Sequence, residues 1–364
     1  MNFNEHVKDN ILDLKGLTQI KIQDLISFLQ KSPHIIRLSL VDSYISDVGI
    51  KALAESPCLE KLEQLNLYQN NINAEGAIAL AESSYLLNLK QLDLGLNNIG
   101  AAGAEALAES KNLRNLEQLD LRWNNIGAAG AEALAKSPYL VHLKQLDWGL
   151  NYIGAEATKT LAESRNLEAL KQFALYGNNI GDVGAKALAK SPYLVNLEQF
   201  DLNTNYIGAI GAKALAESEN LENLKHLNLK GNHIGVTGAK ALAESPYLVH
   251  LEQLDLESNS IGDIGVRALA ESRNLGTLEQ LNLRNNLIGA TGAEFLAESP
   301  YLVHLKQLDL ESNSIGDIGA RALAKSKNLG TLEQLNLKGN HISAEGAEFL
   351  AESPYLVNLE SNLI

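Results

Sequence analysis

The sequence of 364 residues contains a single cysteine, Cys58, so no disulfide can form within the chain. This excludes a small secreted domain held together by disulfides and favours a reducing compartment, the cytoplasm. No apolar run reaches the roughly 18 residues of a membrane span, and the N-terminal stretch MNFNEHVKDN is polar. We therefore expect neither a membrane-spanning helix nor a Sec signal peptide.

An excess of basic residues is absent as well. The chain has 44 acidic and 30 basic residues, which gives a net charge of −14 and a pI near 5.1. Such a charge opposes binding to phosphate backbones and anionic lipids, so the sequence predicts that neither nucleic acid nor a membrane is a partner. A protein with a basic surface remains a suitable partner.

What the sequence does contain is a repeat of 27 residues, here numbered by position from 1 to 27. Twelve copies cover residues 35–358. They begin at Ile35, Leu62, Leu89, Leu116, Leu143, Leu170, Leu197, Leu224, Leu251, Leu278, Leu305 and Leu332. A repeat of this length cannot bury its own core, so neighbouring copies must stack to form a solenoid.

Each repeat has the pattern of one strand and one helix. Positions 1, 4 and 6 are large and apolar and position 9 is Asn in eleven of twelve copies, so LxxLxLxxN alternates like a half-buried strand. The stretch that follows, GAAGAEALAES at residues 100–110, is rich in alanine with helical apolar spacing. The sequence therefore predicts an α/β solenoid with a parallel β-sheet. Trp148, at position 6, is predicted to lie in the core.

These motifs resemble the leucine-rich-repeat proteins of the ribonuclease-inhibitor-like subfamily. The resemblance covers about nine tenths of the chain and implies a horseshoe with the sheet on the concave face and helices on the convex face. We interpret residues 1–34 as an N-terminal cap and residues 359–364 as a partial terminal repeat. The chain is expected to be a monomer, with end-to-end association available through its C-terminal edge.

Strand positions 3, 5 and 7 are expected to point to the concave face. Position 5 carries Asp93, Asp120 and Asp147 in consecutive repeats. Three adjacent carboxylates could bind a divalent cation, act as an acid/base pair, or be solvated and balanced by Arg122. We favour an acidic floor for a basic partner, because the same Asp recurs on other repeats without a distinguishing neighbour.

Large apolar and aromatic residues gather at positions 7 and 8 of five successive repeats, where no core position requires them. A row of this kind beside an arginine and an acidic floor is typical of a protein-binding site. The alternative is ordinary surface, since scattered exposed apolar residues are common. The predicted partner-binding residues are Tyr68, Leu96, Arg122, Trp123, Leu150, Tyr176, Asp93, Asp120 and Asp147.

No motif for catalysis, metal or cofactor binding is found, and the recurrent Asn at position 9 is interpreted as a turn residue that bonds neighbouring backbone groups. We therefore predict no enzyme activity, no metal and no cofactor. The near-identical repeats and the lack of fused domains resemble bacterial leucine-rich-repeat effectors, which implies a virulence protein that binds a host protein in the host cytoplasm. The alternative is a regulator of the same subfamily, either a GTPase-activating protein or an enzyme inhibitor.

Overall fold

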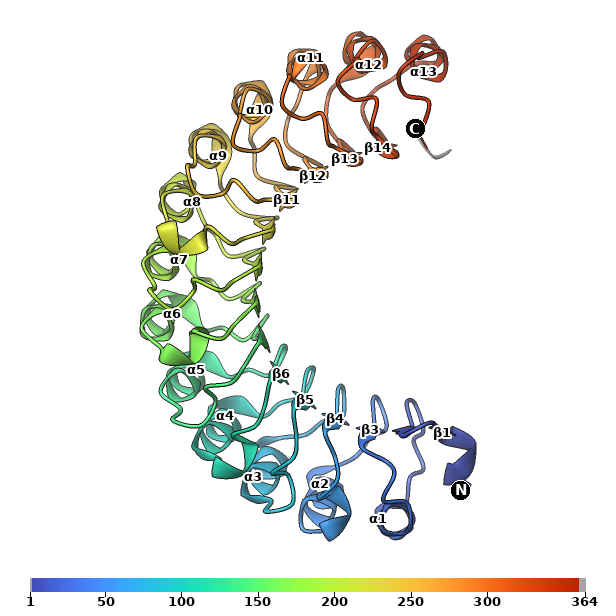
Figure 1. The fold of residues 1–364 in the computed structure, drawn as a ribbon, viewed down its shortest axis with the longest axis vertical. Helices are drawn as coiled ribbons and strands as arrows, with labels where there is room; N and C mark the ends of the chain where they lie inside the picture. Colours follow the sequence, from blue (N-terminus) through green and yellow to red (C-terminus); the bar gives the residue numbers. More distant parts are fainter. Residues whose placement is uncertain (1, 360–364) are drawn as a thin grey trace. The chain divides into compact units, whose positions relative to one another are not determined.

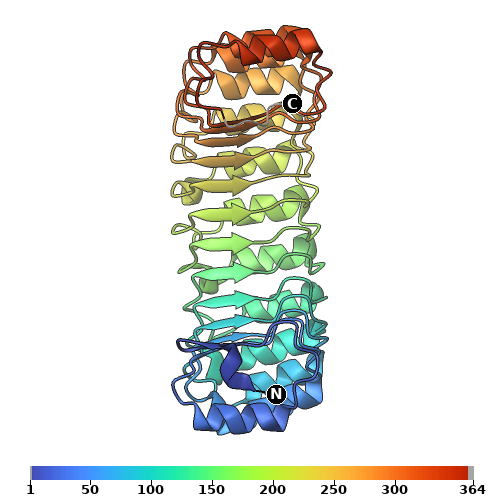
Figure 2. The same ribbon diagram turned by 90° about the vertical axis from the view of Figure 1, so that its right-hand side faces the viewer.

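The computed structural model describes residues 2–359 and comprises two compact units, residues 1–178 and 179–364. Each unit is a stack of strand–helix repeats, and in each the strands lie side by side while the helices form a second layer (Figures 1 and 2).

The first unit has one antiparallel pair at its start and parallel pairs after it. β1 (Val7–Lys8) runs antiparallel to β2 (Ile11–Asp13), which is parallel to β3. Every later strand occupies positions 3–5 of its repeat and aligns with the same positions of its neighbour. The strands are β3 (Arg37–Ser39), β4 (Gln64–Asn66), β5 (Gln91–Asp93), β6 (Gln118–Asp120), β7 (Gln145–Asp147) and β8 (Gln172–Ala174).

One helix follows each strand of the first unit from β2 to β7. These helices are α1 (Ile22–Lys31), α2 (Asp47–Ala54), α3 (Ala74–Glu82), α4 (Gly100–Glu109), α5 (Gly127–Ala135) and α6 (Gly154–Ala162). Short 3-10 helices lie at Phe3–His6, Pro57–Leu59, Lys111–Leu113 and Arg165–Leu167.

The second unit repeats the same arrangement, and all its strand pairs are parallel. Its strands are β9 (Gln199–Asp201), β10 (His226–Asn228), β11 (Gln253–Asp255), β12 (Gln280–Asn282), β13 (Gln307–Asp309) and β14 (Gln334–Asn336). Its helices are α7 (Gly181–Ala189), α8 (Ala209–Ala216), α9 (Gly235–Ala243), α10 (Gly262–Ala270), α11 (Ala290–Glu298), α12 (Gly316–Ala324) and α13 (Ala344–Ala351), with a 3-10 helix at Glu219–Leu221.

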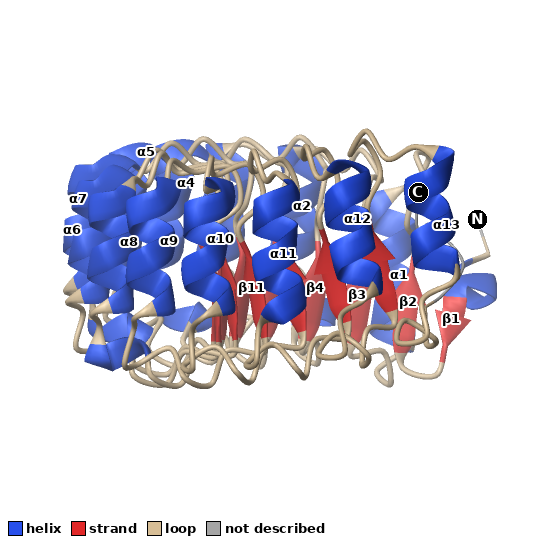
Figure 3. Ribbon diagram, turned by 90° about the horizontal axis from the view of Figure 1, so that it is seen from above, coloured by secondary structure: helices blue, strands red, loops and turns tan. Residues whose placement is uncertain are grey.

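The core of each unit lies between its sheet and its helices (Figure 3). Leucines at positions 1, 4 and 6 point into this layer from the strand side, as Leu116, Leu119 and Leu121 do with 2% exposure or less. Trp148 takes a position-6 site and is buried, as predicted. The prediction of an α/β solenoid with a parallel sheet is confirmed.

The two ends of the repeat array differ from the middle. Residues 1–34, interpreted from the sequence as a cap, contain β1, β2 and α1, so the parallel sheet starts one strand before the first 27-residue repeat. Leu25, Ile26 and Leu29 of α1 are buried. Most of the partial terminal repeat predicted at 359–364, namely residues 360–364, lies outside the described residues, and so does any edge for end-to-end association there.

A row of buried asparagines at position 9 holds the turn at the end of each strand. Asn151 is fully buried; its Oδ1 accepts from the backbone N–H groups of Asn124 and Ile126 at 3.0 and 3.2 Å. Its Nδ2 donates to the backbone carbonyls of Leu121, Trp148 and Gly149 at 2.8–3.2 Å. The predicted bonding of backbone groups is confirmed, and it also links each repeat to its neighbour.

Six of the seven helices in the second unit start in one of two ways, and α13 starts after a serine, Ser343. In α7, α9, α10 and α12 the helix begins at a position-12 glycine with φ near +60°. In α8 and α11 the position-12 glycine is extended, and an aspartate of the preceding repeat takes the role of the cap. The Oδ1 atom of Asp182 accepts from the N–H groups of Gly208 and Gly211, both at 2.7 Å. A carboxylate at a helix N-terminus stabilises otherwise unpaired N–H groups.

Replacing Asp182 with alanine should therefore lower the free energy of unfolding of the second unit by about 1 kcal/mol. The reason is that two N–H groups of the first turn of α8 lose their acceptor. Denaturant unfolding followed by circular dichroism measures the change. The matched control is Asp182→Asn, which keeps an Oδ1 acceptor and should lose less; equal losses in both variants would contradict the capping role.

Candidate functional site

The predicted site residues all lie in the first unit, at the ends of strands β4 to β8, and they form three rows. Each row runs across neighbouring repeats, so its members are 27 residues apart. We name them the aspartate row (position 5: Asp93, Asp120, Asp147), the tyrosine–arginine row (position 7: Tyr68, Gly95, Arg122, Gly149, Tyr176) and the apolar row (position 8: Leu96, Trp123, Leu150). We call the three rows together the first-unit surface.

The aspartate row has a structural role that the sequence analysis missed. In each member, Oδ1 accepts a hydrogen bond from the backbone N–H two residues later: Gly95 at 2.9 Å, Arg122 at 3.0 Å and Gly149 at 2.9 Å. Asparagines at the same position, such as Asn66, accept the same bond. One carboxylate oxygen of each aspartate therefore fixes the turn, and the Oδ2 atoms of Asp120 and Asp147 face Arg122.

Arg122 lies at the centre of the tyrosine–arginine row. Its Nε is 3.2 Å from Oδ2 of Asp120, and its Nη1 is 3.7 Å from Oδ2 of Asp147. The guanidinium carbon lies 5.2 Å from the centre of the Tyr68 ring, a cation–π contact. Tyr176 is half-buried, and burial together with the carboxylates of Asp147 and Asp120 raises the pKa of its phenol to about 12.

Two glycines make room for the tyrosine rings. A Cβ atom at residue 149 would collide with the Tyr176 ring, and one at residue 95 would lie 2.9 Å from the Tyr68 ring. Neither glycine has a positive φ, so the requirement is space rather than backbone conformation. The sequence analysis did not include Gly95 and Gly149; their alternation with Tyr68, Arg122 and Tyr176 at position 7 was the available signal.

The apolar row holds an unfavourable backbone conformation. Leu96, Trp123 and Leu150 have φ values of 53°, 57° and 56°, the left-handed region, which costs a residue with a side chain roughly 1 kcal/mol or more. Position 8 takes this conformation in every repeat; in the second unit the residues there are Thr204, Gly231, Ser258, Asn285, Ser312 and Gly339, none of them large and apolar. Trp123 is 50% exposed, so the core does not account for its size.

Burial and neighbouring carboxylates raise the pKa of Asp120. Burial, followed by the negative charges of Asp147 and Asp93, raises the pKa of Asp120 to about 7, although the backbone N–H and charge of Arg122 act in the opposite direction. Burial also raises the pKa of Asp93. At neutral pH, Asp120 is therefore protonated in roughly half of the molecules.

This shift predicts a pH-dependent effect of Asp120→Asn on stability. Below about pH 4 the carboxyl is protonated in both the folded and the unfolded chain, and between pH 4 and 7 only the folded chain keeps its proton. Asp120 therefore makes the wild-type chain lose stability as pH rises through this range, and the variant lacks this contribution. At pH 8 the variant should be more stable by on the order of 2 kcal/mol.

The measurement is urea unfolding of both chains at pH 4 and pH 8. Asparagine at this position is compatible with the fold because Asn66 makes the same backbone bond. If the free energies of unfolding of the two chains differ by the same amount at both pH values, the raised pKa of Asp120 is not the cause of the difference.

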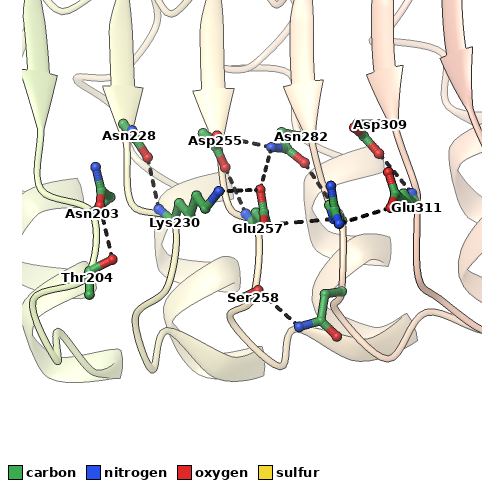
Figure 4. A network of polar contacts seen from close by, with 12 residues as sticks. Asn203, Thr204, Asn228, Lys230, Asp255, Glu257, Ser258, Asn282, Asp309 and Glu311 are labelled. Carbon is green, nitrogen blue, oxygen red and sulfur yellow. Dashed lines mark hydrogen bonds and ion pairs between the residues drawn. The ribbon is translucent and has the colours of Figure 1, made fainter.

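The second unit carries a different pattern at the same positions (Figure 4). Position 7 alternates in charge there: Lys230 Nζ is 3.0 Å from Glu257, and Arg284 is 3.9 Å from Glu257 and 2.9 Å from Glu311. Position 5 alternates Asp with Asn, so Asn282 Nδ2 donates to Oδ2 of Asp255 at 3.0 Å. These charges find partners on neighbouring strands, as expected of a structural ladder.

Other kinds of site find no support among residues 2–359. No three His, Cys, Asp or Glu side chains there form a group suited to hold a metal ion. None of the helices in that part of the chain is both long and apolar enough to cross a membrane.

Comparisons with known proteins agree with the repeat architecture. The sequence model described as Leucine Rich repeat matches more than half of the chain, in nine segments: residues 58–81, 85–108, 112–135, 168–189, 220–243, 247–270, 276–297, 301–324 and 330–351. No curated protein matches.

Two solved structures are similar in fold. An internalin of Listeria monocytogenes has 21% sequence identity and a TM-score of 0.53, with 93% of each chain covered. A leucine-rich-repeat protein of Leptospira interrogans has 19% identity and a TM-score of 0.50, covering 98% of this chain and 97% of the other.

Proposed function

The chain belongs to the leucine-rich-repeat family, and on that premise we propose that its first-unit surface is the site at which it binds a protein partner. Leucine-rich-repeat proteins are generally protein-interaction modules. We further propose that the chain is not itself catalytic and that it belongs to the ribonuclease-inhibitor-like subfamily.

The observation that supports this site is the size of the apolar side chains in the apolar row. Position 8 has a positive φ in all twelve repeats, and large apolar side chains occur there only in the three successive repeats with Leu96, Trp123 and Leu150. Trp123 is 50% exposed, so a side chain of this size does not serve the core, and neighbouring surface apolar side chains are characteristic of binding sites. Trp and Tyr beside an arginine are also the residue types that dominate binding energy at protein interfaces.

The biological role we propose is that of a bacterial effector that acts on a host protein with a basic surface. Its support is the resemblance of the near-identical repeats to such effectors, the single cysteine, and the net charge of −14. In this role the chain works in the host cytoplasm.

Affinity capture from a eukaryotic cell lysate tests the site. The wild-type chain is compared with a Trp123→Ala/Tyr176→Ala variant and with a matched variant of the second unit, Tyr206→Ala/Leu287→Ala. Tyr206 and Leu287 are 61% and 71% exposed, so the control removes comparable surface.

The proposal predicts a protein that the wild-type and control chains retain and the first-unit variant loses, although all three melt alike. Retention of the same proteins by all three chains would contradict it.

A further inference from the structure

We propose that a cavity in the second unit, between the ends of α8 and α9 and beside Tyr247, binds a guanidinium group. The source of that group is an arginine side chain of another protein or a free guanidino compound. The cavity shares no residue with the first-unit surface, so the site is independent of the proposed function.

The loops from helix to strand repeatedly place a basic residue before a tyrosine. From residue 111 onward, five tyrosines at position 24 each follow the position-23 residue of the preceding repeat by 28 residues. Four of these five position-23 residues are lysine or arginine, and the fifth is a glutamate. The pairs are Lys111 with Tyr139, Arg165 with Tyr193, Glu219 with Tyr247, Arg273 with Tyr301 and Lys327 with Tyr355.

The pair of Arg273 and Tyr301 shows what the basic residue does. Arg273 Nε donates to the phenol oxygen of Tyr301 at 2.9 Å, and the guanidinium carbon lies 5.9 Å from the ring centre. The loop of Tyr247 is built in the same way, because the backbone N–H of each tyrosine donates to a serine Oγ at 3.2 Å. Tyr247 therefore has the backbone setting of Tyr301, but the exposed Glu219 stands in place of the arginine.

The Tyr247 loop also lacks a large ring that accompanies Tyr301. At position 18, α11 carries Phe295, whose ring centre lies 5.3 Å from the guanidinium carbon of Arg267. The same position in α9 is Ala241, which lines a cavity of about 450 Å³ together with Tyr247. A cavity of this size has room for a guanidinium group and its aliphatic chain.

The charges around the cavity favour a cation. Glu217 and Glu244 line it just after the ends of α8 and α9, where the helix carbonyls add negative partial charge. Their lysine partners, Lys213 and Lys240, lie 3.6 and 3.7 Å away, but both ion pairs are exposed and contribute little. The two carboxylates can therefore accept a guanidinium, to which the Tyr247 ring adds a cation–π contact.

The test is fluorine NMR of the full chain labelled with fluorotyrosine, in which Tyr247→Phe assigns the Tyr247 signal. The chain is titrated with acetyl-arginine amide, with its uncharged citrulline match, and with an acetylated peptide that has one arginine among glycines. Glu219→Arg restores the residue type found at Arg273 and should place its own guanidinium on Tyr247. Glu222→Arg makes the same charge change in the same loop and is the matched control.

We expect the Tyr247 signal to shift with both arginine compounds and not with the citrulline compound. Tighter binding of the peptide would identify a protein arginine as the source, and equal binding a free guanidino compound. Glu219→Arg should weaken binding at least about tenfold, and Glu222→Arg should leave it within about twofold of wild type. No shift with either arginine compound, an equal shift with citrulline, or a Glu219→Arg variant that binds like Glu222→Arg would overturn the inference.

Discussion

Replacing Asn151 with alanine is expected to lower the free energy of unfolding of the first unit by about 3–5 kcal/mol. The amide of Asn151 bonds five backbone groups of two adjacent repeats, all in the buried turn. Alanine leaves these donors and acceptors without partners in a place that water does not reach. Few single substitutions in this chain remove so many buried hydrogen bonds at once.

Denaturant unfolding followed by circular dichroism measures this loss, and Asn98→Ala is the matched control. Asn98 lies in the same type of turn but is exposed, and its Oδ1 accepts only from the exposed side chain of Asn125. The control should change stability by less than about 0.5 kcal/mol. A loss below about 1 kcal/mol for Asn151→Ala would mean that the buried backbone groups find other partners. That result would contradict the role given above to the buried asparagines at position 9.

The second large effect is expected on binding rather than on stability. Replacing Trp123 with glycine should weaken binding of the captured partner at least about 100-fold, the range typical of a central tryptophan at an interface. Stability should change by no more than about 1 kcal/mol, because relief of the left-handed strain offsets the loss of the tryptophan's partial packing.

Titration calorimetry with the purified partner gives the change in affinity, and thermal unfolding gives the change in stability. Gly231 and Gly339 occupy this position in other repeats, so glycine is compatible with the turn. A variant that loses stability in proportion to its affinity would show that Trp123 supports the fold rather than the contact.

The repeat pattern was sufficient to predict the fold. Leucines at positions 1, 4 and 6 and the alanine-rich stretch after them fix where strand and helix lie, and stacking follows because one repeat has too little core. Trp148 was correctly placed in the core because it occupies a leucine position. These properties depend on spacing within the chain, which the sequence displays directly.

The site was harder to predict because its geometry arises between repeats. The sequence shows Asp93, Asp120 and Asp147 as three carboxylates, but not that one oxygen of each is bonded to a backbone N–H. It likewise does not reveal that tyrosine rings lie over Gly95 and Gly149. Contacts of this kind depend on which repeat a side chain leans toward, and the period alone does not encode that direction.

The backbone strain at position 8 had a visible signal that the sequence analysis did not use. Glycine recurs there at Gly177, Gly231 and Gly339, which indicates a left-handed conformation. A leucine or tryptophan there departs from the other repeats, whose residues at this position are glycine or the polar Asp42, Gln69, Thr204, Ser258, Asn285 and Ser312. Such conflicts between local preference and the residue present tend to mark functional positions.

The most direct test of the central claim is hydroxyl-radical footprinting of the chain with and without its captured partner. Trp123 and Tyr206 are 50% and 61% exposed, so both are accessible to oxidation in the free protein. If the first-unit surface is the binding site, oxidation of Trp123 falls severalfold in the complex while that of Tyr206 is unchanged. Protection of Tyr206 with no change at Trp123 would place the partner on the second unit and contradict the account.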